Sequence, residues 1–250
     1  MLALKLFLVP SLICVITLAG RRWGPAVAGW ISGFPVVSAP VLFFLATDQG
    51  AQFAAVAAAA TLSAVLAVFL FALGYAWTAT RTHWLPSLIA GLFGYFAAVG
   101  VLSLVGPPVW LSAPVVYAAV ALGPRAFPAA AAASRAPISG YPELAMRMAA
   151  GAALVLAVTY FASDLGPRLS GLFAMFPVLG TVLAVFSHRH AGAPFAVSLL
   201  RSMTLGYYAF TSFCLVLALA LPRLTIVAAF TLALAVATLV QALARRHIVR

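Results

Sequence analysis

The chain has 250 residues, of which 66% are apolar and only 7% are charged, and its mean hydropathy is +1.17. A soluble domain of this length carries about a quarter charged residues, so the composition excludes an ordinary soluble protein. The net charge of +11 comes from basic residues scattered between apolar runs. Scattered charges of this kind are typical of residues that set membrane topology, and they argue against a nucleic-acid-binding patch.

Long apolar runs rich in Ala and Leu predict an all-α integral membrane protein. In hydrocarbon every unpaired backbone group is costly, and only helices or closed barrels satisfy all of them. Barrel strands would alternate polar and apolar residues over about ten positions, whereas these runs are longer and continuous. A span needs roughly 20 apolar residues, and the candidate segments are 2–20, 24–46, 51–79, 84–105, 109–122, 144–163, 167–187, 195–221 and 224–244.

The first candidate, 2–20, contains a single basic residue, Lys5 near its start, and is followed by Arg21 and Arg22. A secretory signal would carry its basic residues before the apolar run and would end in a small-residue cleavage site. We therefore interpret 2–20 as a membrane helix.

The fifth candidate, 109–122, is short, and Pro114 interrupts it. Nine spans with the N-terminus outside leave three basic residues outside: Lys5, Arg168 and Arg223. Nine basic residues then lie in the cytoplasm: Arg21, Arg22, Arg81, Arg125, Arg135, Arg189, Arg245, Arg246 and Arg250. Without this crossing the same residues divide five against seven. Because cytoplasmic loops carry an excess of Lys and Arg, we predict about nine spans with a cytoplasmic C-terminus.

The stretch 123–143, GPRAFPAAAAASRAPISGYPE, tolerates more polar residues than any other part of the chain. Its prolines and its two arginines predict a cytoplasmic connection between two units. The first unit, with its linking fifth helix, is 1–122, and the second is 144–250.

A shift of 142 residues places GPAVAGWISGFPVVSAPVLFF over GPRLSGLFAMFPVLGTVLAVF without a gap. Eleven of 31 aligned positions are identical, where composition alone gives roughly three. Gly50 and Gly192 are among the identical pairs. Corresponding helices lie five spans apart, and an odd offset turns the second copy over in the membrane. We therefore predict two inverted-topology repeats, an architecture that many secondary transporters use.

Pro35 and Pro177 lie at one repeat position, near the centre of their predicted spans. Proline lacks an N–H and clashes with the carbonyl four residues back, so each helix is expected to kink or break there. A break exposes carbonyls on one side and the positive end of a half-helix on the other. Ser38 and Thr181 follow the two breaks and predict a polar pocket. The alternative is that both prolines merely allow small residues to pack.

Arg201 lies a turn or two inside the eighth predicted span, in SLLRSMTLGYYAFTS. An arginine within a span is costly unless its side chain reaches the headgroups or finds a partner. One interpretation is that Arg201 extends to the cytoplasmic interface. The other is that it faces the bundle with Tyr207 and Tyr208 and binds an anionic group. In the second case Arg201→Ala should abolish uptake or flipping in reconstituted vesicles.

The sequence offers no catalytic constellation. The only acids, Asp48, Glu143 and Asp164, fall near predicted helix ends, which disfavours a proton relay centred on a carboxylate. The HRH at 188–190 is expected to be interfacial instead of metal-binding. HExxH, GxGxxG and Walker A patterns are absent. We predict no enzyme, no metal and no cofactor.

The second half combines a small-residue tract ending in Phe-Pro, a short polar loop, an early basic residue and a Tyr-containing stretch, through Gly171, Phe176, Pro177, Arg201 and Tyr208. In these features, over roughly 145–245, it resembles the GlpM-type and DUF3147-type small bacterial inner-membrane proteins. The resemblance implies a bacterial inner-membrane location and a role linked to exopolysaccharide production, and it supplies no established activity. Those proteins are about half as long, which suggests that single units pair as antiparallel dimers.

Two functions follow as alternatives. The first is a small transporter or flippase for an anionic or lipid-linked substrate, with a midplane site formed by Pro35, Ser38, Pro177, Thr181, Arg201, Tyr207 and Tyr208. The second is a non-transporting membrane partner or scaffold for an envelope or polysaccharide assembly complex. A polar cavity that reaches both prolines favours transport, and a closed apolar core favours the partner role. The lipid bilayer is the expected partner, and a homodimer is left open.

Overall fold

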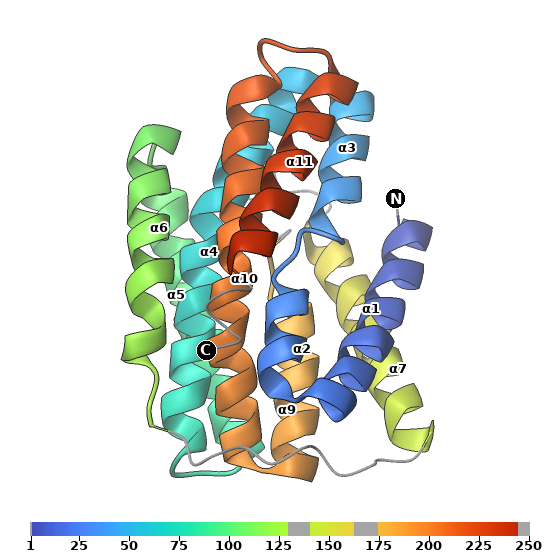
Figure 1. The fold of residues 1–250 in the computed structure, drawn as a ribbon, viewed down its shortest axis with the longest axis vertical. Helices are drawn as coiled ribbons and strands as arrows, with labels where there is room; N and C mark the ends of the chain where they lie inside the picture. The colour runs from blue at the N-terminus through green and yellow to red at the C-terminus, as the bar shows by residue number, and fades with distance from the viewer. Residues whose placement is uncertain (1, 130–140, 163–174, 245–250) are drawn as a thin grey trace.

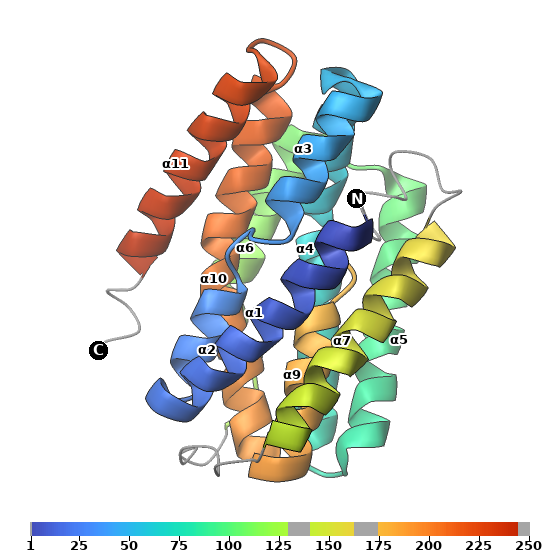
Figure 2. The ribbon, with the colours of Figure 1, turned by 90° about the vertical axis from the view of Figure 1, so that its right-hand side faces the viewer.

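The structure, a computed structural model, describes residues 2–129, 141–162 and 175–244. Over these ranges it is a bundle of helices without strands (Figures 1 and 2). Seven of the described helices are long and apolar enough to cross a membrane. The predicted all-α class is confirmed, and the seven helices fit a membrane protein.

The seven long helices are α1 (Leu2–Trp23), α4 (Ala51–Ala79), α5 (Trp84–Val105), α6 (Val109–Ala126), α7 (Tyr141–Ala162), α10 (Ala193–Ala220) and α11 (Ile226–Ala244). The three shorter ones are α2 (Pro25–Ser32), α3 (Ser38–Gln49) and α9 (Val178–Ala191). The bounds of α4 and α5 agree with the predicted spans. The predicted connection, 123–143, overlaps the end of α6 and the start of α7. Residues 167–174 of the seventh predicted span lie outside the described ranges.

Successive helices run in alternating directions along the long axis of the bundle (Figure 1). In that view α1 descends, α2 and α3 rise one after the other, α4 descends, α5 rises and α6 descends. After the connection α7 rises, α9 descends, α10 rises and α11 descends. Most of the described basic residues sit at the lower ends of these helices, namely Arg21, Arg22, Arg81, Arg125 and Arg189.

Two central helices, α4 and α10, carry most of the core. About two thirds or more of each is buried, against a third or less of the other long helices. The linking helix α6 packs on both. The Ser63 hydroxyl on α4 donates a hydrogen bond to Ser112 on α6 (2.9 Å), and Tyr117 on α6 shares one with Ser212 on α10 (2.7 Å). The outer helices therefore present apolar faces away from the core, as lipid contact requires.

The helix α2 approaches α10 more closely than side chains would allow. Gly33 lies directly against the backbone of Gly206, and a Cβ on Gly29 would lie 2.5 Å from the carbonyl oxygen of Leu199. Glycines permit such contact because they bring two backbones together without intervening side chains. The contact holds the end of α2 against the middle of α10.

Helix boundaries follow the same 142-residue shift as the sequence. Ala51 and Ala193 begin α4 and α10, and Trp84 and Ile226 begin α5 and α11. The glycine before each central helix, Gly50 or Gly192, has a positive φ, 91° and 83° respectively. This backbone conformation favours glycine because it has no Cβ, which explains why both copies carry it.

Candidate functional site

Each half of the chain has a helix boundary at its Phe-Pro pair. The helix α2 ends at Ser32, residues 33–37 form a turn, and α3 begins at Ser38. In the second half, α9 begins at Val178, directly after Pro177. Proline cannot donate the hydrogen bond that would continue a preceding helix, so a new helix starts after it in each case.

The two boundaries have the same hydrogen bonds. The N–H of Val36 donates to the Phe34 carbonyl (2.8 Å), and that of Val178 donates to the Phe176 carbonyl (2.7 Å). Each bond closes a three-residue turn around the proline. The next bonds run to the proline carbonyls, from the N–H of Ala39 to Pro35 (2.9 Å) and from that of Thr181 to Pro177 (2.7 Å). The 142-residue correspondence therefore includes the backbone hydrogen bonds at the two prolines.

This arrangement leaves two backbone N–H groups without a hydrogen-bond acceptor among the described residues at the N-terminus of α3, and two at the N-terminus of α9. They belong to Val37, directly before α3, to Ser38, its first residue, and to Leu179 and Gly180 in α9. The first N–H groups of any helix lack an intrahelical partner, and here no side chain caps them. Both N-termini lie at about mid-height in the bundle (Figures 1 and 2).

A cavity of about 130 Å³ lies where the two N-termini meet. All four residues with free N–H groups line it, together with Phe34 and Pro177. Its walls come from α1, α4, α7 and α10, and they are mainly apolar, as at Val9, Val68, Val155 and Phe210. None of the described residues that line it is charged.

Three hydroxyl side chains besides Ser38 line this central cavity. Ser32 donates to the Gly29 carbonyl (2.7 Å) and Thr61 donates to the Ala57 carbonyl (2.7 Å), so both satisfy their own helices. Tyr207 is only 5% exposed, and its hydroxyl has no hydrogen bond among the described residues. Tyr207 and Ser38 are therefore two lining residues whose hydroxyls make no hydrogen bond with the described residues.

The cavity unites part of the predicted site. Ser38, Pro177 and Tyr207 line it, and Pro35 is buried between the lining residues Phe34 and Val37. Thr181 lies one position beyond Gly180 and lines a separate apolar depression beside α7. Its hydroxyl is buried without a hydrogen-bond partner among the described residues.

Tyr208 and Arg201 lie elsewhere on α10. The Tyr208 ring packs 6.4 Å from that of Tyr117 on α6, on another side of the helix from Tyr207. The Arg201 side chain is exposed and does not line the central cavity. Binding of an anionic group by Arg201 stays a prediction that this position does not support, and an exposed side chain agrees with the alternative that it extends to the interface.

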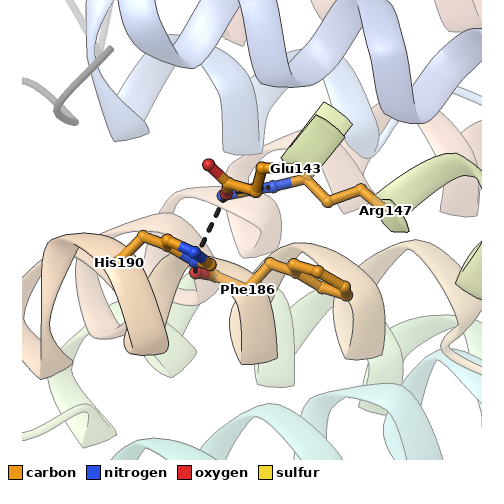
Figure 3. Close-up of polar contacts among 4 residues, drawn as sticks. All are labelled: Glu143, Arg147, Phe186 and His190. Atoms are coloured by element: carbon orange, nitrogen blue, oxygen red, sulfur yellow. Dashed lines mark hydrogen bonds and ion pairs between the residues drawn. The ribbon is translucent and has the colours of Figure 1, made fainter. Parts of the chain in front are cut away.

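A second polar group, which the sequence analysis missed, lies between α7 and α9 (Figure 3). The guanidinium of Arg147 donates to Oε1 of Glu143 from Nη2 (2.5 Å) and Nε (2.8 Å). His190 Nδ1 lies 3.3 Å from the same oxygen, and its ring stacks on Phe186. Glu143 and Arg147 are both buried, with side chains 7% and 6% exposed.

The four-residue spacing of Glu143 and Arg147 is the sequence feature that indicates this ion pair. Residues four apart lie on one helix face, and Glu before a basic residue is the favourable order. The predicted connection ends at Glu143 and so separates it from Arg147, whereas both residues lie on α7. No group of three or more His, Cys, Asp or Glu side chains in the described ranges is arranged to hold a metal.

Comparisons of the chain with models of known protein families, with curated proteins and with solved structures found no match. The resemblance to the GlpM-type proteins thus stays an expectation from the sequence.

Proposed function

We propose that the protein is a small transporter of the bacterial inner membrane, and that its substrate site is the cavity between the α2–α3 interruption and the start of α9. The observation that supports it is that both Phe-Pro segments, 142 residues apart in the sequence, border one cavity. Secondary transporters place their sites near the bilayer midplane between discontinuous helices of two repeats.

The proposed topology has nine crossings. Seven are the long helices, one is α2 followed by α3, and one ends with α9. The alternating directions in Figure 1 support this count. The arginines at the lower ends of α1, α4, α6 and α9, against Arg223 after α10, favour a cytoplasmic lower side with the N-terminus outside.

The proposed inversion rests on paired helices that run in opposite directions. α4 corresponds to α10 by the 142-residue shift, and α1 corresponds to α7. In each pair one helix descends and the other rises (Figures 1 and 2), and the two helices pack on each other. Likewise α5 contacts α9 and α11 contacts α3, which are corresponding contacts under the same shift. A two-fold axis in the membrane plane would produce this pattern.

The rival function is a non-transporting membrane partner of an envelope complex. The apolar walls of the cavity and the exposed position of Arg201 are the observations that favour it. A partner protein needs no cavity that opens to water, whereas a transporter must open its site to each side in turn. Water access to the cavity therefore separates the two functions without knowledge of the substrate.

The test is thiol labelling of a Gly180→Cys variant in a chain whose Cys14 and Cys214 are replaced by Ala. A Cβ on Gly180 meets its nearest neighbour, a Phe71 ring carbon, at an ordinary 3.5 Å, so the side chain fits. Membrane-impermeant thiosulfonate reagents are applied to right-side-out and to inside-out vesicles. We expect labelling from both sides, because a transport site is exposed alternately.

The matched control is Gly100→Cys, in α5, where an added side chain meets open space at an exposed position. That position faces lipid on the proposed topology and should stay unlabelled. Protection of the Gly180→Cys variant from both sides would reject the transport proposal and favour the partner role.

A further inference from the structure

We propose that the central cavity binds a small organic monoanion, whose charged group lies between the N-termini of α3 and α9. This inference rests on the proposed function only in treating the bound anion as the transported substrate. Binding of the anion can be measured without transport. Such a site narrows the substrate to a compact molecule with one negative group and an apolar body.

The donors for the anion are backbone groups. The N–H groups of Val37, Ser38, Leu179 and Gly180 have no acceptor among the described residues, and all four residues line one cavity. Free N–H groups at a helix N-terminus bind anions because they point along the helix axis with the positive end of its dipole. Here two helices of 12 and 14 residues, which run in opposite directions, bring those ends together.

The charge of the ligand follows from the same geometry. A helix N-terminus is equivalent to roughly half an elementary charge, so two of them together offset about one negative charge. The described lining residues add no charge of either sign. A dianion would keep an uncompensated charge in an apolar cavity, which is costly.

The C-terminal end of α2, which carries the opposite partial charge, also reaches this cavity. Three of its last four carbonyls accept bonds from other donors, whereas that of Ser32 accepts none from the described residues. Ser32 Oγ donates to Gly29 (2.7 Å), Gln241 Nε2 on α11 donates to Trp30 (2.9 Å), and the Phe34 N–H donates to Ile31 (3.2 Å). These bonds offset part of the negative end of α2, whereas two N–H groups at each of the N-termini of α3 and α9 have no acceptor among the described residues. The cavity therefore favours anions over cations.

Tyr207 is an independent indication of a ligand. A hydroxyl that borders a cavity without a protein partner is available as a donor to a ligand. The Tyr207 side chain is 95% removed from solvent, lines the cavity and makes no hydrogen bond with the described residues. An anionic oxygen between the two N-termini would give this donor an acceptor.

The size and the walls of the cavity limit the size and polarity of the rest of the ligand. Its volume is about 130 Å³, close to the roughly 150 Å³ of an apolar cavity that accepts benzene. Val9, Val68, Val155 and Phe210 offer an apolar surface. A short carboxylate with a compact apolar body fits these conditions, whereas a lipid-linked saccharide is far too large. We take benzoate as the probe.

The experiment measures binding of benzoate, benzamide and benzylamine to the purified full-length protein by titration calorimetry at pH 7.5. Benzoate should bind, whereas neutral benzamide and cationic benzylamine should bind at least about tenfold more weakly, because they cannot use the N-terminal charge. Benzamide or benzylamine binding as tightly as benzoate would overturn the inference.

The paired variants Ser38→Asp and Ser38→Asn separate charge from shape. An aspartate in the first turn of α3 is favourable for the helix, so the variant should fold, and its carboxylate would occupy the positive end. We expect Ser38→Asp to weaken benzoate binding at least about tenfold and the nearly isosteric Ser38→Asn to change it less than about threefold. Equal affinities of the two variants would also overturn the inference.

Tyr207→Phe tests the side-chain donor with little change in packing. Loss of one hydrogen bond should weaken benzoate about two- to tenfold and leave benzamide nearly unaffected. An unchanged benzoate affinity would remove Tyr207 from the site.

The inference and the transport proposal fail in different ways. If benzoate binds with the expected dependence on Ser38 while the Gly180→Cys variant is protected from both sides, the anion site stands and transport fails. If the variant is labelled from both sides but benzoate does not bind, transport stands and the anion site fails.

Discussion

The carboxylate of Glu143 and the guanidinium of Arg147 form an ion pair on α7 that the bundle buries against α9. Removing two charges from water is costly, and the mutual attraction offsets that cost only when geometry and hydrogen bonding are good. Two donors of Arg147 share one carboxylate oxygen, and the Phe186 ring lies 5.4 Å from the guanidinium carbon, whereas Oε2 of Glu143 is buried without a partner among the described residues. His190 adds a contact from α9 to the same oxygen.

Glu143→Gln should therefore destabilise the protein by about 3–5 kcal/mol, because Arg147 keeps its buried charge without a countercharge. Thermal unfolding in detergent, followed by near-ultraviolet circular dichroism, would show a lower midpoint. The control is the double variant Glu143→Leu with Arg147→Leu, which removes both charges and should be close to the wild type. A single variant as stable as the wild type would show that Arg147 reaches water or another partner.

For single residues, the sequence indicated a part of the candidate site only where a backbone effect depends on neighbouring residues in the chain. Pro35 and Pro177 lie at helix boundaries, where the residues that follow them could be named in advance, whereas Pro10 and Pro114 lie inside α1 and α6. The four free N–H groups could not be found from side-chain types, since Val37 and Leu179 have no polar side chain. Whether Arg201 and Tyr208 face the cavity depends on how α10 is rotated about its own axis. In a helix that is apolar all round, the residue pattern does not reveal which face points inward.

Helices, as elements, were predictable because the membrane sets their length. Residues 51–79 and 84–105 needed only a long apolar run bounded by Gly, His or polar residues. The second predicted span, 24–46, is two helices with the interruption at Pro35, where a kink or break was expected. The close contact between α2 and α10 was beyond sequence reasoning about single segments, because Gly206 lies more than 170 residues from Gly33.

Gly33→Ala should disturb the position of α2. The added Cβ would overlap the backbone of Gly206, and neither backbone can yield as a flexible side chain does. We expect a loss of about 1–3 kcal/mol in stability, the usual cost of overpacking. A thermal melt of the detergent-solubilised protein measures it.

The control for Gly33→Ala is Gly100→Ala, in α5, where the new methyl group meets open space. Alanine favours a helix over glycine by about 1 kcal/mol, so this variant should be as stable as the wild type or more so. Equal melting points for Gly33→Ala and the wild type would mean that α2 can shift along α10 without loss.

For the whole molecule, the proposed topology predicts on which side each loop lies. Thr82 follows α4 at the lower end of the bundle, and Leu224 follows α10 at the upper end (Figure 1). Both residues are exposed. In the chain with Cys14 and Cys214 replaced by Ala, Thr82→Cys should react with impermeant reagents only in inside-out vesicles, and Leu224→Cys only in right-side-out vesicles. Labelling of both from one side would contradict the nine-crossing arrangement.

On that topology α6 is the crossing that belongs to neither repeat. A unit of four crossings starts and finishes on the same side, so a simple tandem duplication would insert both copies the same way up. One additional crossing between the two copies makes the second copy start on the opposite side of the membrane, so that it is inverted. On the proposed topology helix α6 is that crossing, and it packs on both α4 and α10. A chain without it would set its two units parallel, and the N-termini of α3 and α9 would no longer face each other across one cavity.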